Sequence, residues 1–287
     1  MIRLSPLLQA FLSVEKNKTV HAAAETLFLT QTAVTQRIKQ LEEKLGVPLF
    51  IRSRKGMQLT EEGQVLLRYC HDMQNLENSY LHSLNMSESD NIIALKLVSS
   101  STLMKTRIVK VVTTIAKLYP QLRLYLQIQD IEARHELLKT GQVDLAIVNN
   151  KQVSKEMCAK VLSPERYVFI VPKAWAKRAI KDVVLNENII DFDSSDDITF
   201  SYLAKYDLLQ FARKDRHFIN SPDQLAQLVG FKLGYTVVTK QFFEQYCDQA
   251  KVVILKDNWF YDHDISLCWY DRGVLPSYFK ALIDAIN

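Results

Sequence analysis

Cysteine is scarce in this chain of 287 residues, and its four cysteines are widely separated. They form no CxxC pair, so the sequence predicts neither a disulfide framework nor a zinc site, and it fits a reducing compartment. Apolar runs are also short, and none approaches the ~20 residues that a membrane-spanning helix needs. The N-terminus lacks the charged-then-apolar pattern of a secretion signal, because Pro6 interrupts it early. We therefore expect a cytoplasmic protein that does not enter a membrane.

Catalytic motifs are missing as well. The chain contains no P-loop, no GxGxxG turn and no GxSxG nucleophile elbow. His263 stands between Asp262 and Asp264, but one such triplet near the start of a strand is typical of a solvated loop rather than of a metal site. We expect a protein that is not an enzyme and that carries no metal and no cofactor.

Basic residues gather at the N-terminal end of the chain. Residues 1–60 hold nine lysines and arginines against four acidic residues, a net charge of +5. Residues 61–90 hold one arginine against six acidic residues, a net charge of −5. A short basic end commonly meets the phosphates of a nucleic acid, although an ordinary solvated face can have the same composition. The charge pattern alone leaves both interpretations open.

Three amphipathic helices are predicted at the N-terminus. Apolar side chains recur at helical spacing over 4–15. Thr19 can cap a second helix, whose run of alanines lets another helix approach closely. Thr30 can cap a third helix, which Gly46 can end in a left-handed conformation. The buried stripe of this third helix is expected to contain Ala33, Val34, Ile38, Leu41 and Leu45.

The exposed start of the third helix is unusually polar. The segment TQTAVTQRIKQ carries glutamine and threonine where ordinary solvent-facing helices favour glutamate and lysine. In a helix-turn-helix the second helix enters the major groove, with its N-terminal residues on base edges. Glutamine can pair with adenine, threonine can meet bases or phosphates, and arginine can reach guanine or phosphate. The residues of this helix expected to contact DNA are Thr30, Gln31, Thr32, Thr35, Gln36, Arg37 and Lys39.

A small hairpin, or wing, is predicted after the third helix. Two short extended segments at 49–51 and 57–59 flank a basic tip that contains glycine. Basic residues in such a wing suit the DNA backbone or the minor groove, where they add salt-dependent affinity but little sequence choice. The wing residues expected to contact DNA are Arg52, Arg54 and Lys55.

A long helix is predicted after Thr60, which can cap it. Its apolar residues step at alternating intervals of three and four, which gives a narrow seam that needs a partner. A second copy of the chain is the expected partner, and packing on its own chain is the alternative. The expected dimerisation residues are Leu66, Tyr69, Met73, Leu76 and Tyr80.

Strands and helices alternate beyond a polar, turn-rich segment at 85–91. This alternation predicts parallel α/β sheets. The expected strands lie at 93–99, 122–129, 143–148, 166–171, 188–193, 216–219, 234–239, 252–255 and 265–270. The expected helices lie at 104–119, 132–140, 197–205, 222–229, 240–247 and 276–286.

The stretch HAAAETLFLTQTAVTQRIKQLEEKLGVPLFIRSRKGMQLTEEGQ resembles the DNA-binding signature of LysR-type transcriptional regulators. Thr35 stands where serine is more usual in that family, and both residues offer a hydroxyl. The resemblance implies a ligand-responsive regulator that binds double-stranded promoter DNA in a sequence-specific way. It also implies a homodimer or homotetramer, with RNA polymerase as a further candidate partner.

The segments LKLVSSSTLM, LYPQLRLYLQI and LLKTGQVDLAIV are similar to the start of the family's effector domain. That domain has two α/β lobes, is shaped like a periplasmic binding protein and holds a small molecule in its cleft. Ligands in such folds sit at strand ends and near helix N-termini. The expected pocket residues of lobe one are therefore Ser99, Ser100, Ser101 and Thr102, with helix capping as their alternative role.

Three further segments, VLSPERYVFIVPKAW, IIDFDSSDDITFSYL and HFINSPDQLAQLVGFKLGYTVV, resemble more narrowly the ArgP/LysG (IciA-like) branch. That branch senses lysine and arginine and activates an exporter gene for them. Two departures keep another metabolite, such as an organic acid, open as the effector. The segment after Gly234 lacks the proline common there, and DLAIVNN looks more general than ArgP-like.

A basic amino acid needs a carboxylate partner for its cationic side chain. The acid-rich turn DFDSSDD can supply one, although its acids can instead favour the positive start of the next helix, which Ser194 and Ser195 would cap. Asp130 could hold the α-amino group, and the hydroxyls and amides of 99–102 could hold the α-carboxylate. The remaining expected effector-binding residues are Asn149, Asp193, Asp196, Asp197 and Asn220.

The sequence thus predicts an N-terminal all-α winged helix-turn-helix with a long linker helix, followed by an α/β two-lobe effector domain. The expected boundaries are 1–60 for the DNA-binding domain, 61–90 for the linker helix and hinge, and 91–287 for the effector domain. Lobe one is expected at about 91–161 plus 266–287, and lobe two at about 162–265. The expected function is control of the export or metabolism of a basic amino acid.

Overall fold

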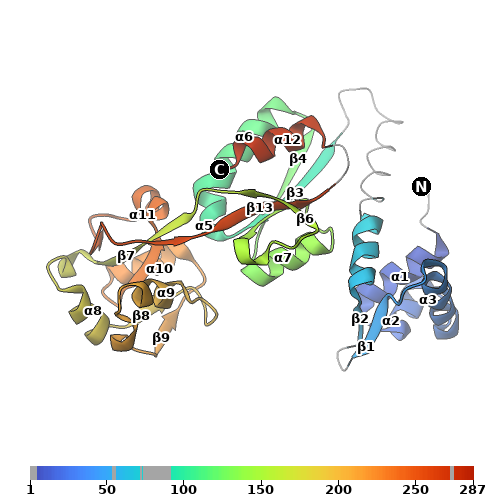
Figure 1. Ribbon diagram of the computed structural model, residues 1–287, viewed down its shortest axis with the longest axis horizontal. Helices are drawn as coiled ribbons and strands as arrows, with labels where there is room; N and C mark the ends of the chain where they lie inside the picture. Colours follow the sequence, from blue (N-terminus) through green and yellow to red (C-terminus); the bar gives the residue numbers. More distant parts are fainter. Residues whose placement is uncertain (1–4, 54–55, 72, 74–91, 272–274) are drawn as a thin grey trace. The chain divides into compact units, whose positions relative to one another are not determined.

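The computed structural model describes residues 5–53, 56–71, 73, 92–271 and 275–287 (Figure 1). The chain divides into two compact units. The first comprises Met1–Leu97, Tyr119–Tyr125 and Glu132–Leu145, and the second comprises Val98–Leu118, Leu126–Ile131 and Ala146–Asn287. None of the described helices has both the length and the apolar character needed to cross a membrane.

Three helices and a hairpin form the N-terminal module, and their predicted caps are confirmed. The Oγ1 of Thr19 accepts the amide of Ala22 at 3.2 Å, and the Oγ1 of Thr30 accepts the amide of Ala33 at 3.1 Å. Gly46 ends the third helix with a φ of 75°. The elements are α1 (Pro6–Asn17), α2 (Val20–Leu27), α3 (Gln31–Leu45), β1 (Phe50–Ser53) and β2 (Gly56–Leu59), and the chain is helical again over 61–71.

Close packing of α2 builds the core of this module. Ala23 and Ala24 are buried on α2 and share one apolar cluster with residues of α1, α3 and the helix at 61–71. The predicted stripe on α3 is confirmed where Val34, Ile38 and Leu41 enter this cluster. It is wrong for Leu45, which is 47% exposed because it lies in the last turn of α3, beyond the cluster.

The wing is fixed to two different parts of the helical module. The Oε1 of Glu42 on α3 accepts the amides of Leu49 and Phe50 at 2.7 and 3.4 Å. On the other strand, the amide of Met57 donates to the carbonyl of Lys18 at 2.7 Å. Gly56 lies beside this bond with a φ of 101°, and a Cβ there would lie 2.4 Å from the Lys18 oxygen. A glycine is therefore required where the wing meets the turn after α1.

The α/β part of the chain contains one five-stranded sheet, one four-stranded sheet and one two-stranded sheet. The strands are β3 (Ile93–Ser99), β4 (Leu122–Ile128), β5 (Leu145–Asn149), β6 (Met157–Val161), β7 (Glu165–Pro172), β8 (Ile189–Asp191), β9 (Arg216–Phe218), β10 (Thr236–Thr239), β11 (Val252–Ile254), β12 (Tyr261–His263) and β13 (Ile265–Tyr270). The α-helices are α5 (Ser101–Leu103), α6 (Val109–Leu118), α7 (Ile131–Lys139), α8 (Ile180–Asn186), α9 (Ile198–Lys205), α10 (Pro222–Gly230), α11 (Lys240–Tyr246) and α12 (Ser277–Ala285). Shorter turns are the π-helical η2 (Met104–Ile108) and the 3-10 segments η3 (Asn150–Gln152), η4 (Lys173–Trp175) and η5 (Leu209–Phe211).

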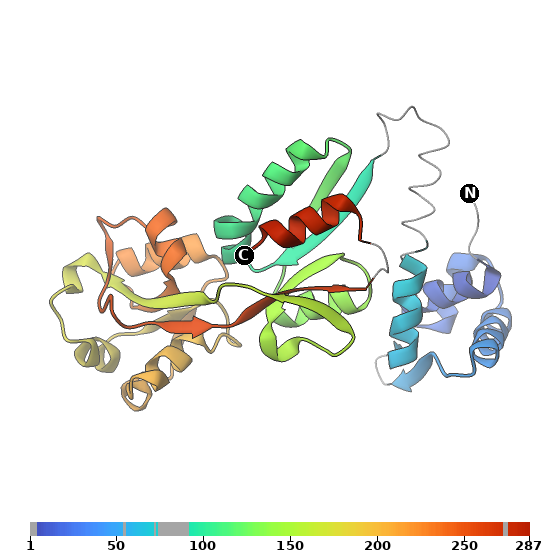
Figure 2. The ribbon, with the colours of Figure 1, turned by 45° about the horizontal axis from the view of Figure 1, so that its top comes forward.

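The expectation of parallel sheets is wrong for β13 in the five-stranded sheet and for the pairings of β7 in the four-stranded sheet. In the order β4-β3-β5-β13-β6, strand β13 runs antiparallel to both β5 and β6. Strand β7 runs antiparallel to β10, β11 and β12. The chain leaves the five-stranded sheet through β7 and returns through β13, so these strands meet their neighbours in the opposite direction (Figure 2). Parallel pairing is found between β8 and β9, and Ile189 also forms a parallel bridge with Tyr235.

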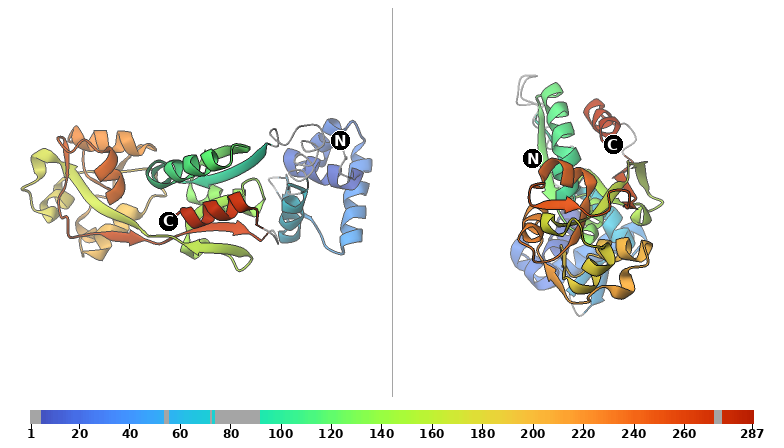
Figure 3. Two further views of the ribbon diagram at one scale, coloured as in Figure 1. Left: turned by 90° about the horizontal axis from the view of Figure 1, so that it is seen from above. Right: turned by 90° about the vertical axis from the view of Figure 1, so that its left-hand side faces the viewer.

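The sheet around β7 is covered on both faces. Val168 and Ile170 pack into a cluster with α10 and α11, whereas Phe169 and Val171 pack into a cluster with α8 and α9. This alternation is the period of two that a strand buried on both faces requires. Figure 3 shows α10 and α11 against this sheet. The near-continuous apolar run of 168–171 is therefore explained by burial on two sides.

Most of the predicted elements are found within a few residues of their expected bounds. The predicted helix at 104–119 begins earlier, at Ser101, and contains the π-helical turn η2 before α6. Strands β6 and β12 and helix α8 were not expected. β12 is three residues long and β6 alternates polar and buried residues, so neither gives a strong pattern.

The bond between Glu42 and the wing yields a stability prediction. Glu42→Ala leaves two amides at the start of the wing without their charged acceptor. The wing should thereby lose about 1.5–3 kcal/mol of stabilising free energy. All three tryptophans lie beyond residue 91, so tryptophan fluorescence does not report on this module. We therefore expect amide hydrogen exchange at Leu49 and Phe50 to accelerate by about tenfold to a hundredfold.

Two variants control this measurement. Glu42→Gln keeps an acceptor and should accelerate exchange less than Glu42→Ala. Glu43→Ala removes the neighbouring exposed carboxylate, whose only described bond is a 3.8 Å ion pair with Lys39, and should leave exchange within about twofold of wild type. Equal exchange rates in Glu42→Ala and wild type would contradict the proposed anchoring.

Candidate nucleic-acid interface and ligand site

The outer face of α3 presents the polar residues that the sequence singles out. Thr30, Gln31, Thr32, Thr35, Gln36 and Lys39 are exposed, and Arg37 is half-buried. The opposite face of the same helix supplies buried residues to the core of the module. The helix therefore holds itself to the module with its apolar stripe and leaves hydrogen-bonding groups on the surface.

Two of these exposed side chains have partners of their own. The Nε2 of Gln31 lies 3.0 Å from the Nδ1 of His21, which is on α2. Lys39 forms an i,i+4 ion pair with Glu43 at 3.8 Å. An exposed pair of this kind contributes little stability and opens readily for another anion.

The wing contributes one described basic side chain. Arg52 is exposed on β1. Arg54 and Lys55 lie outside the described residues. Antiparallel pairing from Phe50 with Leu59 to Ser53 with Gly56 confirms the predicted hairpin.

The predicted dimerisation seam is described only in its first half. Leu66 packs partly against the core of its own module, whereas Tyr69 is 54% and Met73 is 36% exposed. Val65 is exposed as well and lies four residues before Tyr69, so three exposed apolar side chains follow one another at intervals of four. Leu76 and Tyr80 lie outside the described residues.

The expected ligand residues of lobe one gather at the ends of β3 and β5. Ser99 is fully buried, and its Oγ has no hydrogen-bond partner among the described residues. Ser100 caps α5 by accepting the amide of Leu103 at 3.2 Å, which is the alternative role considered for this group. Ser101 and Thr102 follow in the first turn and are half-buried. Hydroxyls and helix amides therefore lie together after β3.

Two further expected residues lie near this end of the five-stranded sheet. The amide of Gln129 donates to the carbonyl of Ser99, the last residue of β3, at 3.2 Å. The exposed Asp130 is the next residue after Gln129 and therefore lies near the end of β3. Asn149 ends β5, the strand next to β3. Its side chain contacts the Nε2 of His263 at 3.3 Å and accepts the amide of Lys151 at 2.9 Å.

The acid-rich turn after β8 uses most of its carboxylates to hold its own backbone. Asp193 accepts the amides of Ser195 and Asp196 at 2.7 and 3.1 Å. Asp196 accepts the amides of Phe192 and Ile198 at 3.3 and 3.0 Å, and burial raises its pKa. Asp197 precedes α9 without a side-chain capping bond and is exposed. Asp197 is therefore the most available carboxylate of the three, and the exposed Asn220 follows β9.

A buried ion pair between Asp191 and Arg216 holds the backbone of this turn. Asp191 is 1% exposed and accepts the Oγ1 of Thr199 at 2.6 Å and the Nη1 of Arg216 at 2.7 Å. The same guanidinium donates to the carbonyls of Asp196 and Ser194 at 2.6 and 3.0 Å. Burial raises the pKa of Asp191 to about 6, although the bonds from Thr199 and Arg216 act in the opposite direction.

Sequence reasoning did not select Arg216. Its guanidinium lies 4.6 Å from the Phe200 ring centroid and 5.0 Å from that of Phe218. A strongly acidic turn with no basic residue of its own requires a cation from elsewhere. This requirement is the one feature of the sequence that indicates a basic partner for the turn. The partner could not be identified because it lies 25 residues away from Asp191.

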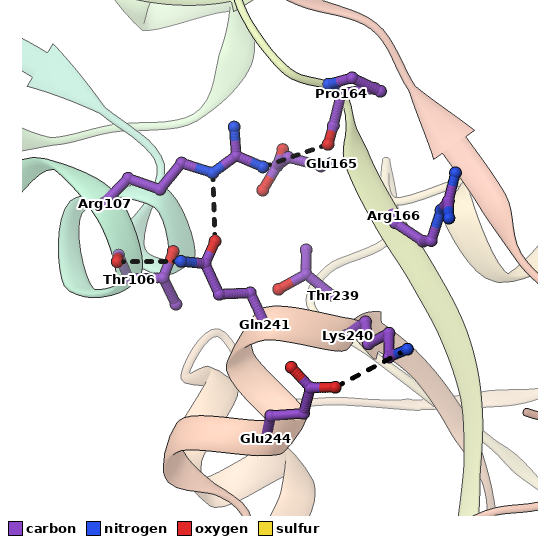
Figure 4. A pocket seen from close by; sticks show the side chains of 9 residues that line it. All are labelled: Thr106, Arg107, Pro164, Glu165, Arg166, Thr239, Lys240, Gln241 and Glu244. Atoms are coloured by element: carbon purple, nitrogen blue, oxygen red, sulfur yellow. Dashed lines mark hydrogen bonds and ion pairs between the residues drawn. The ribbon is translucent and has the colours of Figure 1, made fainter. Parts of the chain in front are cut away.

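A pocket of about 290 Å³ lies elsewhere in the second unit, and none of the expected effector residues lines it (Figure 4). Charged and polar side chains point toward it from α11, from β7 and from the turn η2. Lys240 and Glu244 pair across its edge at 3.7 Å. Its lining residues are Thr106, Arg107, Pro164, Glu165, Arg166, Thr239, Lys240, Gln241 and Glu244.

The turn η2 bonds to α11 and to the segment before β7. Arg107 donates from Nε to the Oε1 of Gln241 at 3.2 Å, and its Nη1 donates to the carbonyl of Ser163 at 2.6 Å. Gln241 in turn donates to the carbonyl of Thr106 at 3.3 Å (Figure 4). These residues were not expected from the sequence, because each pair is separated by more than fifty positions.

Lys105, the neighbour of Thr106, makes further contacts from η2. Its ammonium pairs with Asp223 at the start of α10 and lies 4.1 Å from the Tyr246 ring centroid. The Oη of Tyr246 donates to the Lys105 carbonyl at 3.1 Å. One π-helical turn thus connects the helix after β3 to both α10 and α11. Such turns are frequent at functional sites.

Comparison with known protein families gives two matches along the chain. Residues 6–64 match the bacterial regulatory helix-turn-helix protein, lysR family. Residues 94–287 match the LysR substrate binding domain. The two matches together include α1 to β2 and every strand from β4 onward.

Relatives in sequence and in fold carry related names. The chain is 30% identical over 226 residues to the HTH-type transcriptional regulator ArgP of Yersinia pestis (strain Pestoides F), covering 77% of this chain and 74% of that protein. The crystal structure of ArgP from Mycobacterium tuberculosis matches with a TM-score of 0.76 and 19% identity, over 99% of this chain and 96% of the other. Full-length LysG from Corynebacterium glutamicum with bound effector Arg matches with a TM-score of 0.73 and 18% identity, over 98% and 95%. The two structural matches show the same fold, with winged helix and α/β effector domain in one chain.

The buried Asp191 yields a prediction of pH dependence. Its pKa is about 6 in the folded chain, above the ordinary aspartate value of 3.8, so the folded state holds a proton that the unfolded state releases. Stability from this group is therefore present at low pH and lost as pH rises toward 6. Between pH 4.5 and 7.0 the free energy of unfolding of wild type should fall by about 2 kcal/mol relative to that of Asp191→Asn, whose side chain stays neutral.

Urea unfolding followed by tryptophan fluorescence measures this difference, because Trp175 and Trp259 pack against the cluster above β8. Carboxyls that do not interact with Asp191 titrate in both proteins and cancel in the comparison. If the free energy of unfolding of wild type instead rose with pH relative to that of Asp191→Asn, the ion pair with Arg216 would stabilise the charged carboxylate more than burial destabilises it.

Proposed function

Because this chain belongs to the LysR family of transcriptional regulators, we propose that α3 reads promoter DNA and that the α/β domain senses a basic amino acid. A regulator of this family binds DNA through its helix-turn-helix and a small molecule through its substrate-binding domain, and it is not an enzyme. The proposal concerns which residues perform these tasks and which effector is bound. The observation that carries it is the exposed polar face of α3 in a chain that is 30% identical to ArgP.

The surface of α3 supports direct reading of bases. Gln31, Thr32, Thr35 and Gln36 lie in its first two turns, which enter the major groove in a helix-turn-helix. Glutamine can bond two edges of adenine at once, and threonine can contact a thymine methyl or a phosphate. The proposed DNA-contacting set is completed by Thr30, Arg37, Lys39, Arg52, Arg54 and Lys55, of which the basic residues bind the backbone.

Two observations support a basic amino acid as the effector. The curated relatives are named ArgP, and a protein of the same fold, LysG, is described with bound effector Arg. In this chain, the turn after β8 presents Asp197 to solvent as a carboxylate partner for a cation. Ser101, Thr102 and Asp130 would hold the α-carboxylate and α-amino groups. Export or metabolism of that amino acid is the proposed target of control.

Oligomerisation is part of the proposal. The exposed apolar row formed by Val65, Tyr69 and Met73 supports a second copy as partner of the helix that begins at 61. Binding of the effector would favour one arrangement of the two lobes and so change the spacing of paired DNA-binding modules. The proposed site of action is the cytoplasm, with RNA polymerase as a further partner.

Binding to DNA should depend on salt through the wing. We expect the chain to bind a duplex covering the intergenic region beside its own gene, as measured by fluorescence anisotropy. Arg52→Ala should weaken binding to this duplex and to a scrambled duplex alike, and should reduce the slope of log K against log salt by about 1. Lys44→Ala, at the far end of α3, is the matched control and should change neither quantity. No binding to either duplex at low salt would exclude a DNA-binding role.

The effector should stabilise the domain that binds it. Arginine or lysine at 100 times its dissociation constant adds about 2.7 kcal/mol, which raises the Tm of an effector domain of this size by about 5–10 °C. Asp197→Asn should remove most of this rise, whereas Asp257→Asn, an exposed acid in another turn, should keep it. A rise with succinate or glutamate but not with arginine or lysine would identify an organic acid instead.

A further inference from the structure

One histidine side chain connects the two helices of the helix-turn-helix. His21 lies in the first turn of α2, and Gln31 is the first residue of α3. The Nδ1 of His21 and the Nε2 of Gln31 are 3.0 Å apart, and both side chains are exposed. The bond therefore forms on the surface that the proposed function assigns to DNA, rather than in the core of the module.

The atoms that face each other in this contact determine which tautomer of His21 the hydrogen bond requires. The amide nitrogen of Gln31 faces the ring and only donates, so the bond forms with the His21 tautomer whose Nδ1 carries no proton and accepts. The ring proton of neutral His21 then lies on Nε2, which faces the Oε1 of Glu25 on α2 at 3.5 Å. A proton on Nε2 faces the carboxylate of Glu25, which favours the tautomer that Gln31 needs.

This arrangement gives the Gln31 amide one orientation. A rotation that exchanged its oxygen and nitrogen would bring the amide oxygen against the unprotonated Nδ1, so that two acceptors would face each other. In the observed orientation one N–H of Gln31 bonds to His21. The second N–H and the oxygen remain available, which is the donor and acceptor pair that the N7 and N6 edge of adenine requires.

We propose that His21 is a positioning residue that sets the base preference of Gln31 without reading a base itself. The inference rests on the proposed function of Gln31 as a reader of DNA. A free glutamine at the start of a helix samples several rotamers and both amide orientations, and holding one of them before binding reduces the entropy lost on binding. The histidine thus acts on specificity at one base pair rather than on affinity in general.

The alternative role of His21 is a direct contact with a phosphate. It lies near the N-terminus of α2, and a histidine there could donate to the DNA backbone. A phosphate contact would change affinity for all sequences by the same factor. A positioning role would change discrimination at one base pair only, so the two roles predict different results.

The test compares single and double variants on one set of duplexes. The probe is the best duplex that the wild-type chain selects from a random pool, together with duplexes in which each base pair is replaced in turn. Gln31→Ala first identifies the base pair that Gln31 reads, as the one at which discrimination is lost. His21→Phe keeps an aromatic ring but has no acceptor, and His21→Gln restores an acceptor on a flexible side chain.

We expect His21→Phe to reduce discrimination at the Gln31 base pair by about threefold to tenfold, the effect of one hydrogen bond. Discrimination at the other base pairs should remain within about twofold of wild type. This limit is roughly the deviation from additivity that is usual for distant sites. His21→Gln should recover most of the loss. The double variant His21→Phe with Gln31→Ala should equal Gln31→Ala alone, because His21 then has nothing to position.

Three outcomes would overturn the inference. Uniform weakening on every duplex in His21→Phe would identify a phosphate contact, and additive losses in the double variant would show that His21 acts independently of Gln31. If Gln31→Ala changes discrimination at no base pair, the proposed reading role of Gln31 falls and the inference falls with it. Both side chains are exposed, so none of these variants removes a core contact.

Discussion

Two short crossings of the chain between sheets set the mechanical constraint on the effector domain. The chain passes from β6 to β7 through 162–164 and returns from β12 to β13 through Asp264. The amide of Leu162 donates to the carbonyl of Ile265 at 3.0 Å, so the first crossing is hydrogen-bonded to the start of β13. Two paired strands can bend and twist, but they cannot by themselves fix the angle between the elements on either side.

Side chains on η2 add contacts between the first crossing and the helices α10 and α11. Arg107 reaches the carbonyls of Ser163 and Pro164 at the first crossing and also Gln241 on α11. Lys105 adds an ion pair with α10. These bonds are few, polar and partly exposed, so they can exchange with water or with a ligand at modest cost.

The acid-rich turn shows why composition alone did not locate a ligand site. Four aspartates within seven residues predict a place for a cation, and the structure does place a cation there. That cation is Arg216 of the same chain, which pairs with the buried Asp191 and bonds to two carbonyls of the turn. Asp193 and Asp196 accept backbone amides, so only Asp197 keeps its carboxylate exposed. The turn is first a self-stabilised structure, and any ligand must use what remains.

Local chemistry decided which parts of the fold could be predicted. Caps at Thr19, Thr30 and Gly46 act within four residues, so one sequence suffices to find them. Helices α9 and α10 and strand β13 were found for the same reason, since periodicity is local. Strand direction depends on which strands meet, and β13 meets β5 from more than a hundred residues away. The parallel arrangement was therefore an inference from order along the chain, and pairing in space overturned it for β7 and β13.

Contacts between side chains remained beyond prediction for the same reason, even over short distances. His21 and Gln31 are only ten residues apart, and both stood in the motif that the sequence singled out. The sequence indicates which residues of α3 face outward, because the buried stripe fixes the helix rotation. It does not indicate that a ring on α2 reaches the first of them, because that depends on the angle at which α2 and α3 cross. Ala23 and Ala24 are buried where α2 packs against α1 and α3, and small residues at such a contact let helices approach closely, so the packing of the core bears on which polar groups can meet on the surface.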